Sequence, residues 1–205
     1  MIDHLVLATP DLPATAEWLS ATTGVKPSVG GPHPGRGTHN MLCSFGADHY
    51  LEIIGPDPDQ PDPDRARPFG IDDLTAARLV TWCIQPDDLA AHVAAAATAG
   101  YPYTDLQPMS RQAPDGLLEW TLARPTFDTH GGAVPFCIDW GTTPHPSTVA
   151  NPGLELIGLR ATHPFPGDLA NVLGAVGIGL MIDEGPTPAL HARVSGPAGV
   201  VDLPS

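Results

Sequence analysis

Short apolar runs separated by turns rich in Gly and Pro predict a repeated unit near the start of the chain. Residues 2–8 form an apolar strand interrupted by His4, and Asp11 can cap a helix over residues 14–23, with Pro13 in its first turn. Apolar runs at 24–29, 40–45 and 49–55 predict three more strands, the last two joined by a turn of small residues. The first unit is therefore predicted to be β-α-β-β-β.

The same order of elements follows after residue 78. A strand over 78–85 precedes a helix over 90–99 that ends at Gly100, and strands are predicted near 105–109, 117–123 and 134–140. The Asp-Leu pair at 11–12 recurs at 88–89, which gives an internal repeat offset by 77 residues (88 minus 11). This repeat places Thr81 where the first unit has His4.

A third start is predicted near residue 155. A strand over 154–162, a helix over 167–176 opened by Asp168, a strand over 179–183 and a closing hairpin over 190–203 repeat the β-α-β-β order. Residues 56–68 are acidic and dense in proline, which is typical of a solvated connector. We predict an α+β fold with tandem βαβββ modules at 1–56 and 78–146, a connector at 57–77, and a βαββ unit at 147–205 packed on the same domain.

Charge narrows the possible partners. The formal net charge is −14, which disfavours nucleic acids and anionic membrane surfaces because both attract Lys and Arg. The sequence has neither a signal-like start nor an apolar run of the roughly 20 residues that a membrane span needs, so a cytoplasmic protein is expected. Cys43, Cys83 and Cys137 each lie in an apolar run and are expected to be buried thiols.

Two residues stand out as candidates for chemistry. His4 is an imidazole in an apolar strand, and it is either a ligand or base in a cavity or a core residue bonded to a backbone carbonyl. Glu52 shares one strand face with Tyr50 and Ile54, which suggests that the face is buried. A buried carboxylate must be paired, so Glu52 is expected to be a metal ligand, an acid or base, or the partner of an arginine; the alternative is that it points to solvent.

Other candidates allow two interpretations each. His33 and Arg36 lie in a Gly/Pro-rich loop that either forms the rim of a cavity, where Arg can hold an oxygen bidentately, or is a surface loop. Asn40 either donates to a substrate or caps its strand, and Arg111 either faces the second module's cavity or supports the turn at Pro114-Asp115-Gly116. Trp120 and Trp140 are core residues or stacking platforms. The sequence contains no G-x-S-x-G elbow, P-loop, Rossmann fingerprint or Cys-x-x-Cys.

Several short motifs, in this order and spacing, resemble the glyoxalase-like domain family of the vicinal oxygen chelate superfamily (glyoxalase, bleomycin resistance and dioxygenase proteins). They are the opening Asp-His-Leu-Val-Leu-Ala-Thr-Pro-Asp-Leu, Gly30-Gly31 with 33–38 and Asn40, Tyr50-Leu51-Glu52, Arg111 with 114–116, Trp120, Pro135-Phe136, and Trp140 with His145-Pro146. The resemblance implies paired modules that curl into a half-open barrel of mixed sheet around a cavity for a small molecule.

The resemblance also implies a metal site. Ligands would come from the first and last strands of a module, here His4 and Glu52, and would suit a divalent ion such as Zn, Fe, Mn or Ni. Thr81 breaks the symmetric pattern, so the third ligand is left open among Asp139, His33, His39 and His145, or the site holds no metal.

Three functions follow from this resemblance. The first is a metal-dependent lyase, isomerase or dioxygenase acting on a small oxygen-rich substrate, with Glu52, Arg36 and His33 as catalytic residues. The second is a metal-free binding protein that sequesters a small molecule against Tyr50, Trp120 and Trp140. The third is an interaction role with a vestigial site, and a homodimer is compatible with each of these.

Overall fold

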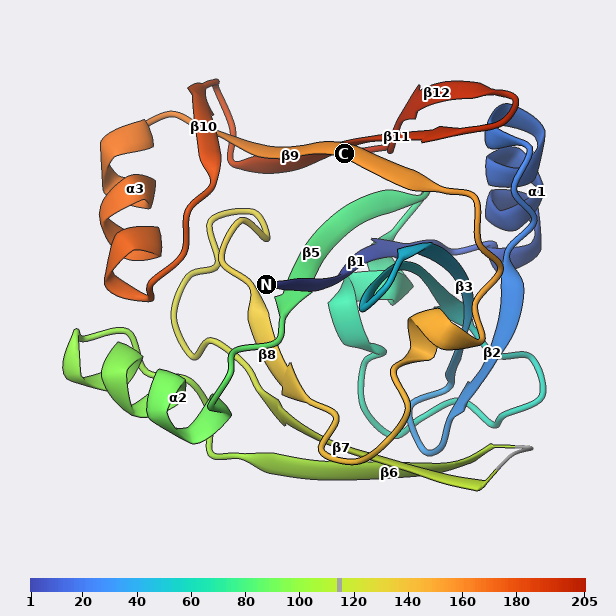
Figure 1. The fold of residues 1–205 in the computed structure, drawn as a ribbon, viewed down its shortest axis with the longest axis horizontal. Coiled ribbons are helices and arrows are strands. Elements are labelled where there is room, and N and C mark those ends of the chain that lie inside the picture. The colour runs from blue at the N-terminus through green and yellow to red at the C-terminus, as the bar shows by residue number, and fades with distance from the viewer. Residues whose placement is uncertain (114–115) are drawn as a thin grey trace.

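The computed structural model confirms the α+β fold and describes residues 1–113 and 116–205, so Pro114 and Asp115 of the predicted turn lie outside the described residues. The first module has its elements in the predicted order (Figure 1). They are β1 (Ile2–Ala8), α1 (Leu12–Thr23), β2 (Ser28–His33), β3 (Thr38–Gly46) and β4 (His49–Pro56).

The second module repeats this order and pairing. It comprises β5 (Arg78–Ile84), α2 (Leu89–Thr98), β6 (Gln107–Ala113), β7 (Gly116–Ala123) and β8 (Phe136–Asp139). In each module the first strand pairs in parallel with the last, β1 with β4 and β5 with β8. Asp11 accepts a hydrogen bond from the backbone N–H of Ala14, and Asp88 does the same from Ala91. The two matched caps confirm the internal repeat.

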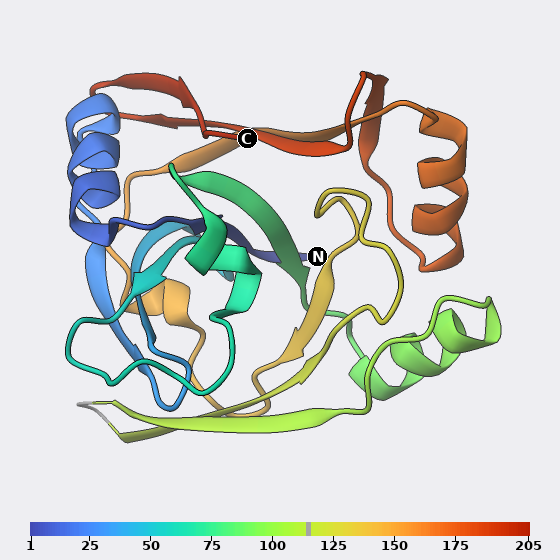
Figure 2. The same cartoon turned by 180° about the vertical axis from the view of Figure 1, so that it is seen from behind.

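Within the described residues, the two modules join into one sheet of eight strands, in the order β2-β3-β4-β1-β5-β8-β7-β6. The antiparallel pair of β1 and β5 lies at its centre, and the sheet curls until its edge strands β2 and β6 approach each other. Gly31 of β2 lies directly against the Arg111 guanidinium of β6. The sheet is thus a nearly closed barrel, with the connector crossing in front of its strands in the view from behind (Figure 2).

Strand β2 departs from its predicted place. It begins at Ser28, after the predicted start at residue 24, and continues through Gly30, Gly31 and Pro32. An edge strand tolerates these residues because one of its sides needs no ladder of hydrogen bonds. The predicted loop is therefore shortened to the turn at residues 34–37, and His33 is placed on a strand end.

The C-terminal unit packs on the barrel, but its strands pair differently from those of the modules. Its elements are β9 (Glu155–His163), α3 (Pro166–Ala175), β10 (Met181–Glu184), β11 (Ala189–Gly196) and β12 (Gly199–Asp202), and the sheet order is β10-β9-β11-β12. Here β9 pairs in parallel with the strand that directly follows the helix, whereas in a module that strand lies at the far edge. The unit repeats the order of elements and not the module topology.

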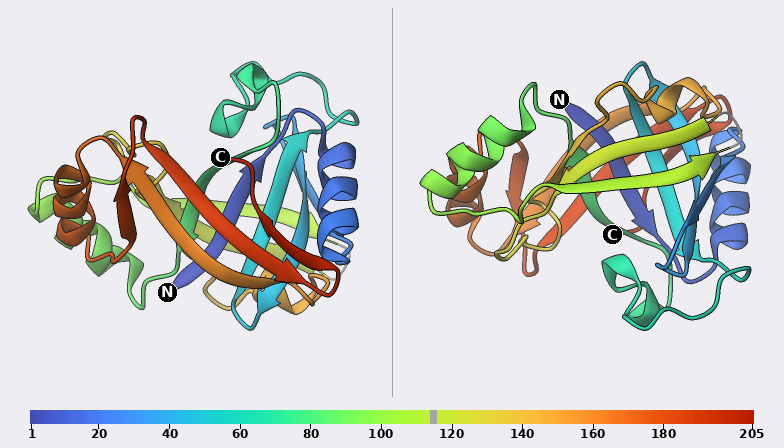
Figure 3. Two further views of the ribbon diagram at one scale, coloured as in Figure 1. Left: turned by 90° about the horizontal axis from the view of Figure 1, so that it is seen from above. Right: turned by 90° about the horizontal axis from the view of Figure 1, so that it is seen from below.

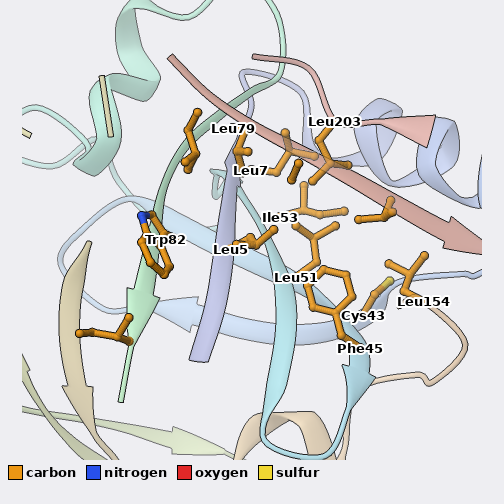
Figure 4. Packing of buried hydrophobic residues seen from close by; sticks show 14 of the residues in the cluster. Leu5, Leu7, Cys43, Phe45, Leu51, Ile53, Leu79, Trp82, Leu154 and Leu203 are labelled. Carbon is orange, nitrogen blue, oxygen red and sulfur yellow. The ribbon is translucent and has the colours of Figure 1, made fainter. Parts of the chain in front are cut away.

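The four-stranded sheet forms a second layer over the outer face of the barrel, between α1 and α3 (Figures 1 and 3). Odd-numbered positions of β1 and β4, such as Leu5, Leu7, Leu51 and Ile53, point outward into this interface and are fully buried. They pack in one cluster with Leu79, Trp82, Leu154 and Leu203 (Figure 4). The barrel and the C-terminal sheet therefore share a core.

The acidic connector is only partly solvated. Most of residues 58–66 are exposed, as predicted, but the chain then forms a short 3₁₀ turn, η1 (Pro68–Asp73). Arg67 holds this turn through ion pairs with Asp62 and Asp72, both at 2.6 Å. Ile71 is buried and Phe69 reaches the barrel cavity, so apolar side chains anchor the end of the connector. Within the described residues, no helix is long and apolar enough to cross a membrane.

Candidate functional site

The barrel encloses a cavity of about 150 Å³ that opens on one side to solvent. Strand alternation selects its lining, because inward positions of each strand are two residues apart. Tyr50, Glu52 and Ile54 of β4 all line it, which confirms the predicted shared face. All of the predicted catalytic and ligand-binding residues line the cavity: His4, His33, Arg36, Asn40, Tyr50, Glu52, Arg111, Trp120 and Trp140.

His4 is held from behind by a carboxylate. Its Nδ1 lies 2.5 Å from Asp3 Oδ1, and its Nε2 lies 3.9 Å from Glu52 Oε2. Alternation predicts that Asp3 and His4 point to opposite faces, but the pairing of β1 with β5 shifts register between Ile2 and His4. Such a bulge re-aims a side chain, which explains how neighbours in one strand meet and why the sequence pattern missed Asp3.

Asp3 is the centre of a buried hydrogen-bond network. Trp140 Nε1 donates to its Oδ2 at 2.9 Å, and His145 Nε2 lies 3.1 Å from the same oxygen. The backbone N–H of Ser147 donates to His145 Nδ1, so neutral His145 carries its proton on Nε2 and donates it to Asp3. Burial raises the pKa of Asp3, but hydrogen bonds from His145, His4 and Trp140 outweigh it and hold the pKa well below its usual range.

His33 approaches Glu52 from the other side in the same manner. Its Nδ1 lies 3.0 Å from Thr38 Oγ1, and its Nε2 lies 3.8 Å from Glu52 Oε1. Burial lowers the pKa of His33. The negative charge of Glu52 raises it and the positive charge of Arg111 lowers it, and the net shift is downward. The imidazole is therefore neutral at pH 7 and keeps a lone pair for a proton or a cation.

Asn40 fixes the carboxylate between the two histidines. Its Nδ2 donates to Glu52 Oε1 at 2.7 Å, and its Oδ1 accepts from the backbone N–H of Gly31 at 2.9 Å. A Cβ on Gly30 would collide with Asn40 Oδ1, and one on Gly31 would collide with Arg111. The Gly30-Gly31 pair is thus explained by the room that two cavity side chains need.

Replacing Gly30 by alanine is expected to displace Asn40 and to destabilise the protein by about 1–3 kcal/mol, the usual cost of overpacking. Urea unfolding measures the change. Gly158→Ala is the matched control, because nothing lies within 4 Å of the new methyl group in that strand. Equal stabilities of the two variants would contradict the packing role of Gly30.

The structure separates the candidates for a third metal ligand. Asp139 is exposed and accepts a hydrogen bond from the Gly141 backbone, because β8 turns Ile138 and Trp140 inward and Asp139 outward. His39 lies outside the cavity lining, on the opposite face from Thr38 and Asn40. His145 contacts Asp3 and does not line the cavity. His33 is the candidate that approaches Glu52.

Asp3, His4 and Cys83 form a further group whose possible ligand atoms lie within 4.8 Å of one another. A thiolate binds metals, whereas a thiol does not. Burial raises the pKa of Cys83 well above its ordinary value, and both oxygens of Asp3 already accept hydrogen bonds. This group fits a core network better than a metal centre, although it shares His4 with the cavity.

Aromatic and basic side chains complete the walls. Tyr50 stacks on His4 with ring centroids 4.7 Å apart, and Trp120 lies 5.7 Å from Trp140. Phe69, Phe136 and Arg124 also line the cavity. Sequence reasoning assigned none of them to it, although Phe136 belongs to one of the motifs. Arg124 could have been found, because Trp120, Leu122 and Arg124 alternate along β7 and its continuation.

One solved structure shows the same fold at low sequence identity. A hypothetical protein from Staphylococcus aureus matches over 99% of this chain and 85% of its own, with a TM-score of 0.67 and 14% identity. Methylmalonyl-CoA epimerase from Mycobacterium tuberculosis matches over 72% of this chain and 91% of its own, with a TM-score of 0.48 and 13% identity.

The sequence itself identifies the family. None of the curated proteins matches it. The family model described as a glyoxalase-like domain matches residues 2–177, which include both modules and extend through α3. The chain therefore belongs to the glyoxalase-like domain family.

Proposed function

We propose that this protein is a metal-dependent enzyme of the isomerase or lyase type, acting on a small oxygen-rich substrate in the barrel cavity. One observation supports this most: His4 and His33 are each anchored at Nδ1 and direct Nε2 toward a different oxygen of Glu52. The separations of 3.9 and 3.8 Å are too long for hydrogen bonds. Two imidazoles and one carboxylate are a donor set suited to a divalent ion.

Each residue has a defined role in this proposal. His4, Glu52 and His33 hold the ion, which when bound polarises an oxygen of the substrate. Asp3 fixes the His4 ring through Nδ1, as carboxylates commonly do behind metal-bound histidines. Asn40 keeps Glu52 in place, and Arg36 at the rim orients an oxygen of the substrate.

Metal analysis of protein purified without a chelator or a His-tag tests the proposal. We expect about one divalent ion per chain, and we expect His4→Ala and Glu52→Gln to lower affinity in titrations with Zn²⁺, Mn²⁺ and Ni²⁺ by at least about a hundredfold. His49→Gln is the control, because His49 lies on the same strand as Glu52 and outside the cavity lining. Equal metal contents in all three variants would rule the proposal out.

A metal-free binding protein is the second candidate. It is favoured by the Asn40 hydrogen bond to Glu52 and the positive charge of Arg111 nearby, which stabilise the carboxylate without an ion. In that case a chelator would leave ligand binding unchanged, and the cavity aromatics would supply the contacts.

A further inference from the structure

Positive charge is concentrated in the cavity of a strongly acidic protein. The sequence has 9 Lys and Arg against 23 Asp and Glu. Three of these basic residues, Arg36, Arg111 and Arg124, line the same cavity. Arg111 and Arg124 are partly buried, and Arg36 is exposed at the rim. Burying even part of a guanidinium is costly unless an anion compensates it, so this grouping needs an explanation.

Three arginines outside the cavity are paired with carboxylates. Arg67 pairs with Asp62 and Asp72, Arg160 pairs with Asp183, and Arg193 pairs with Asp202. In the part of the chain that the structure describes, Arg36 and Arg124 form no such ion pair. The Arg124 Nη1 atom donates to the neutral Gln107 Oε1 at 2.9 Å. The acidic residues of the protein thus leave these two cavity arginines without a counter-ion.

The two unpaired arginines also act on each other. Burial lowers the pKa of Arg124, and the charge of Arg36 lowers it further, so the two guanidinium groups repel each other across the cavity. A bound anion would relieve this repulsion and accept charge-assisted hydrogen bonds from both groups.

We infer that Arg36 and Arg124 form a subsite for the acidic group of the substrate, so that the ligand is a small organic acid. The inference rests on the proposed function and names its substrate class. An acid held there lies in the same cavity as Glu52 and the two histidines, and its carbon skeleton packs against the apolar wall formed by Phe69, Met109, Leu122 and Phe136. Carboxylate and phosphonate are both anionic, and their charges and geometries differ.

Binding of three simple probes tests the subsite. Benzoate and phenylphosphonate carry an acid on a small aromatic body, and benzamide is the uncharged control. Trp120 and Trp140 line the cavity, so tryptophan fluorescence reports occupancy, with calorimetry as the second measurement. At least one acid is expected to bind about tenfold or more tightly than benzamide, and the preferred acid defines the geometry of the group recognised. Equal binding of all three probes would overturn the inference.

Variants locate the effect. Arg124→Gln and Arg36→Gln are each expected to weaken binding of the preferred acid by about tenfold or more, and Arg124→Lys is expected to recover part of it. Arg160→Gln is the matched control, because Arg160 pairs with Asp183 on the C-terminal sheet. If Arg124→Gln binds the acid as well as Arg160→Gln does, the subsite is wrong.

The test of the acid subsite can be separated from the test of the metal site. Arg124→Gln is expected to keep its affinity for Zn²⁺, and His4→Ala is expected to lose Zn²⁺ while still binding the acid in the presence of a chelator. If the wild-type protein binds no metal, the metal proposal is wrong and the acid subsite is unaffected. If the wild-type protein does not prefer an acid over benzamide, the subsite is wrong and the metal proposal is unaffected.

Discussion

Replacing Asp3 by asparagine is expected to destabilise the protein by about 3 kcal/mol at pH 7, because it removes the charged acceptor from a buried network. Asp3 accepts from Trp140 and His145 and anchors His4, and its side chain has no exposed surface. Urea unfolding in the presence of EDTA measures this effect without a contribution from bound metal. The exposed Asp105 provides the control variant Asp105→Asn, which is expected to unfold like the wild type.

The loss is expected to depend on pH in a defined direction. The native protein holds the pKa of Asp3 below its ordinary value, which is about 4 in unfolded chains. The stability that the carboxylate contributes is therefore complete above pH 4 and is lost as the pH falls toward the lower native pKa. The difference between wild type and Asp3→Asn should be constant from pH 7 to 5 and should shrink below pH 4.

The same variant also tests the role of Asp3 behind His4. If His4 is a metal ligand, Asp3→Asn should weaken metal affinity by about 10- to 100-fold, since the carboxylate orients the ring and raises its basicity. A variant that keeps both wild-type stability and wild-type metal affinity would show that the network around Asp3 contributes to neither.

Local sequence patterns predicted a residue's place in the site correctly wherever its side chain follows the alternation of its strand. The pattern at Tyr50, Glu52 and Ile54 indicated a buried face, and Glu52 does line the cavity. The Asp-Leu pairs at 11–12 and 88–89 were sufficient to find the repeat, and both aspartates cap their helices. Alternation failed at Asp3, where a bulge in β1 turns the side chain toward His4. A bulge depends on the partner strand, so it leaves little signal in the sequence of its own strand.

Pairing between strands far apart in the chain was the other feature that the sequence did not predict. The third unit has the predicted order of elements, but whether β9 pairs with β10 or with the last strand depends on contacts across the sheet and with the barrel. The choice of a third metal ligand had the same difficulty. Asp139 and Ile138 are neighbours in β8, so one of them faces the cavity and the other faces away. Only the register of β8 against β7 shows that Ile138 faces the cavity and that Asp139 does not.

Introducing aspartate at Val194 is expected to unfold the barrel as well as the C-terminal sheet. Val194 on β11 is fully buried in the cluster that contains Leu5, Leu51 and Trp82 of the barrel. An unpaired carboxylate there should cost at least about 4 kcal/mol, a large part of the 5–15 kcal/mol by which most domains are stable. The control is Val200→Asp on the neighbouring strand, where the side chain is 63% exposed and the change should stay within about 0.5 kcal/mol.

Tryptophan fluorescence makes this test specific. All four tryptophans, at positions 18, 82, 120 and 140, precede the C-terminal unit, so their unfolding transition reports the barrel and its helix. If the two sheets share one cooperative core, Val194→Asp shifts this transition to lower urea concentration together with the loss of β-structure seen by circular dichroism. An unchanged tryptophan transition would mean that the C-terminal sheet unfolds independently, and that the barrel and its cavity are stable without the layer that covers their outer face.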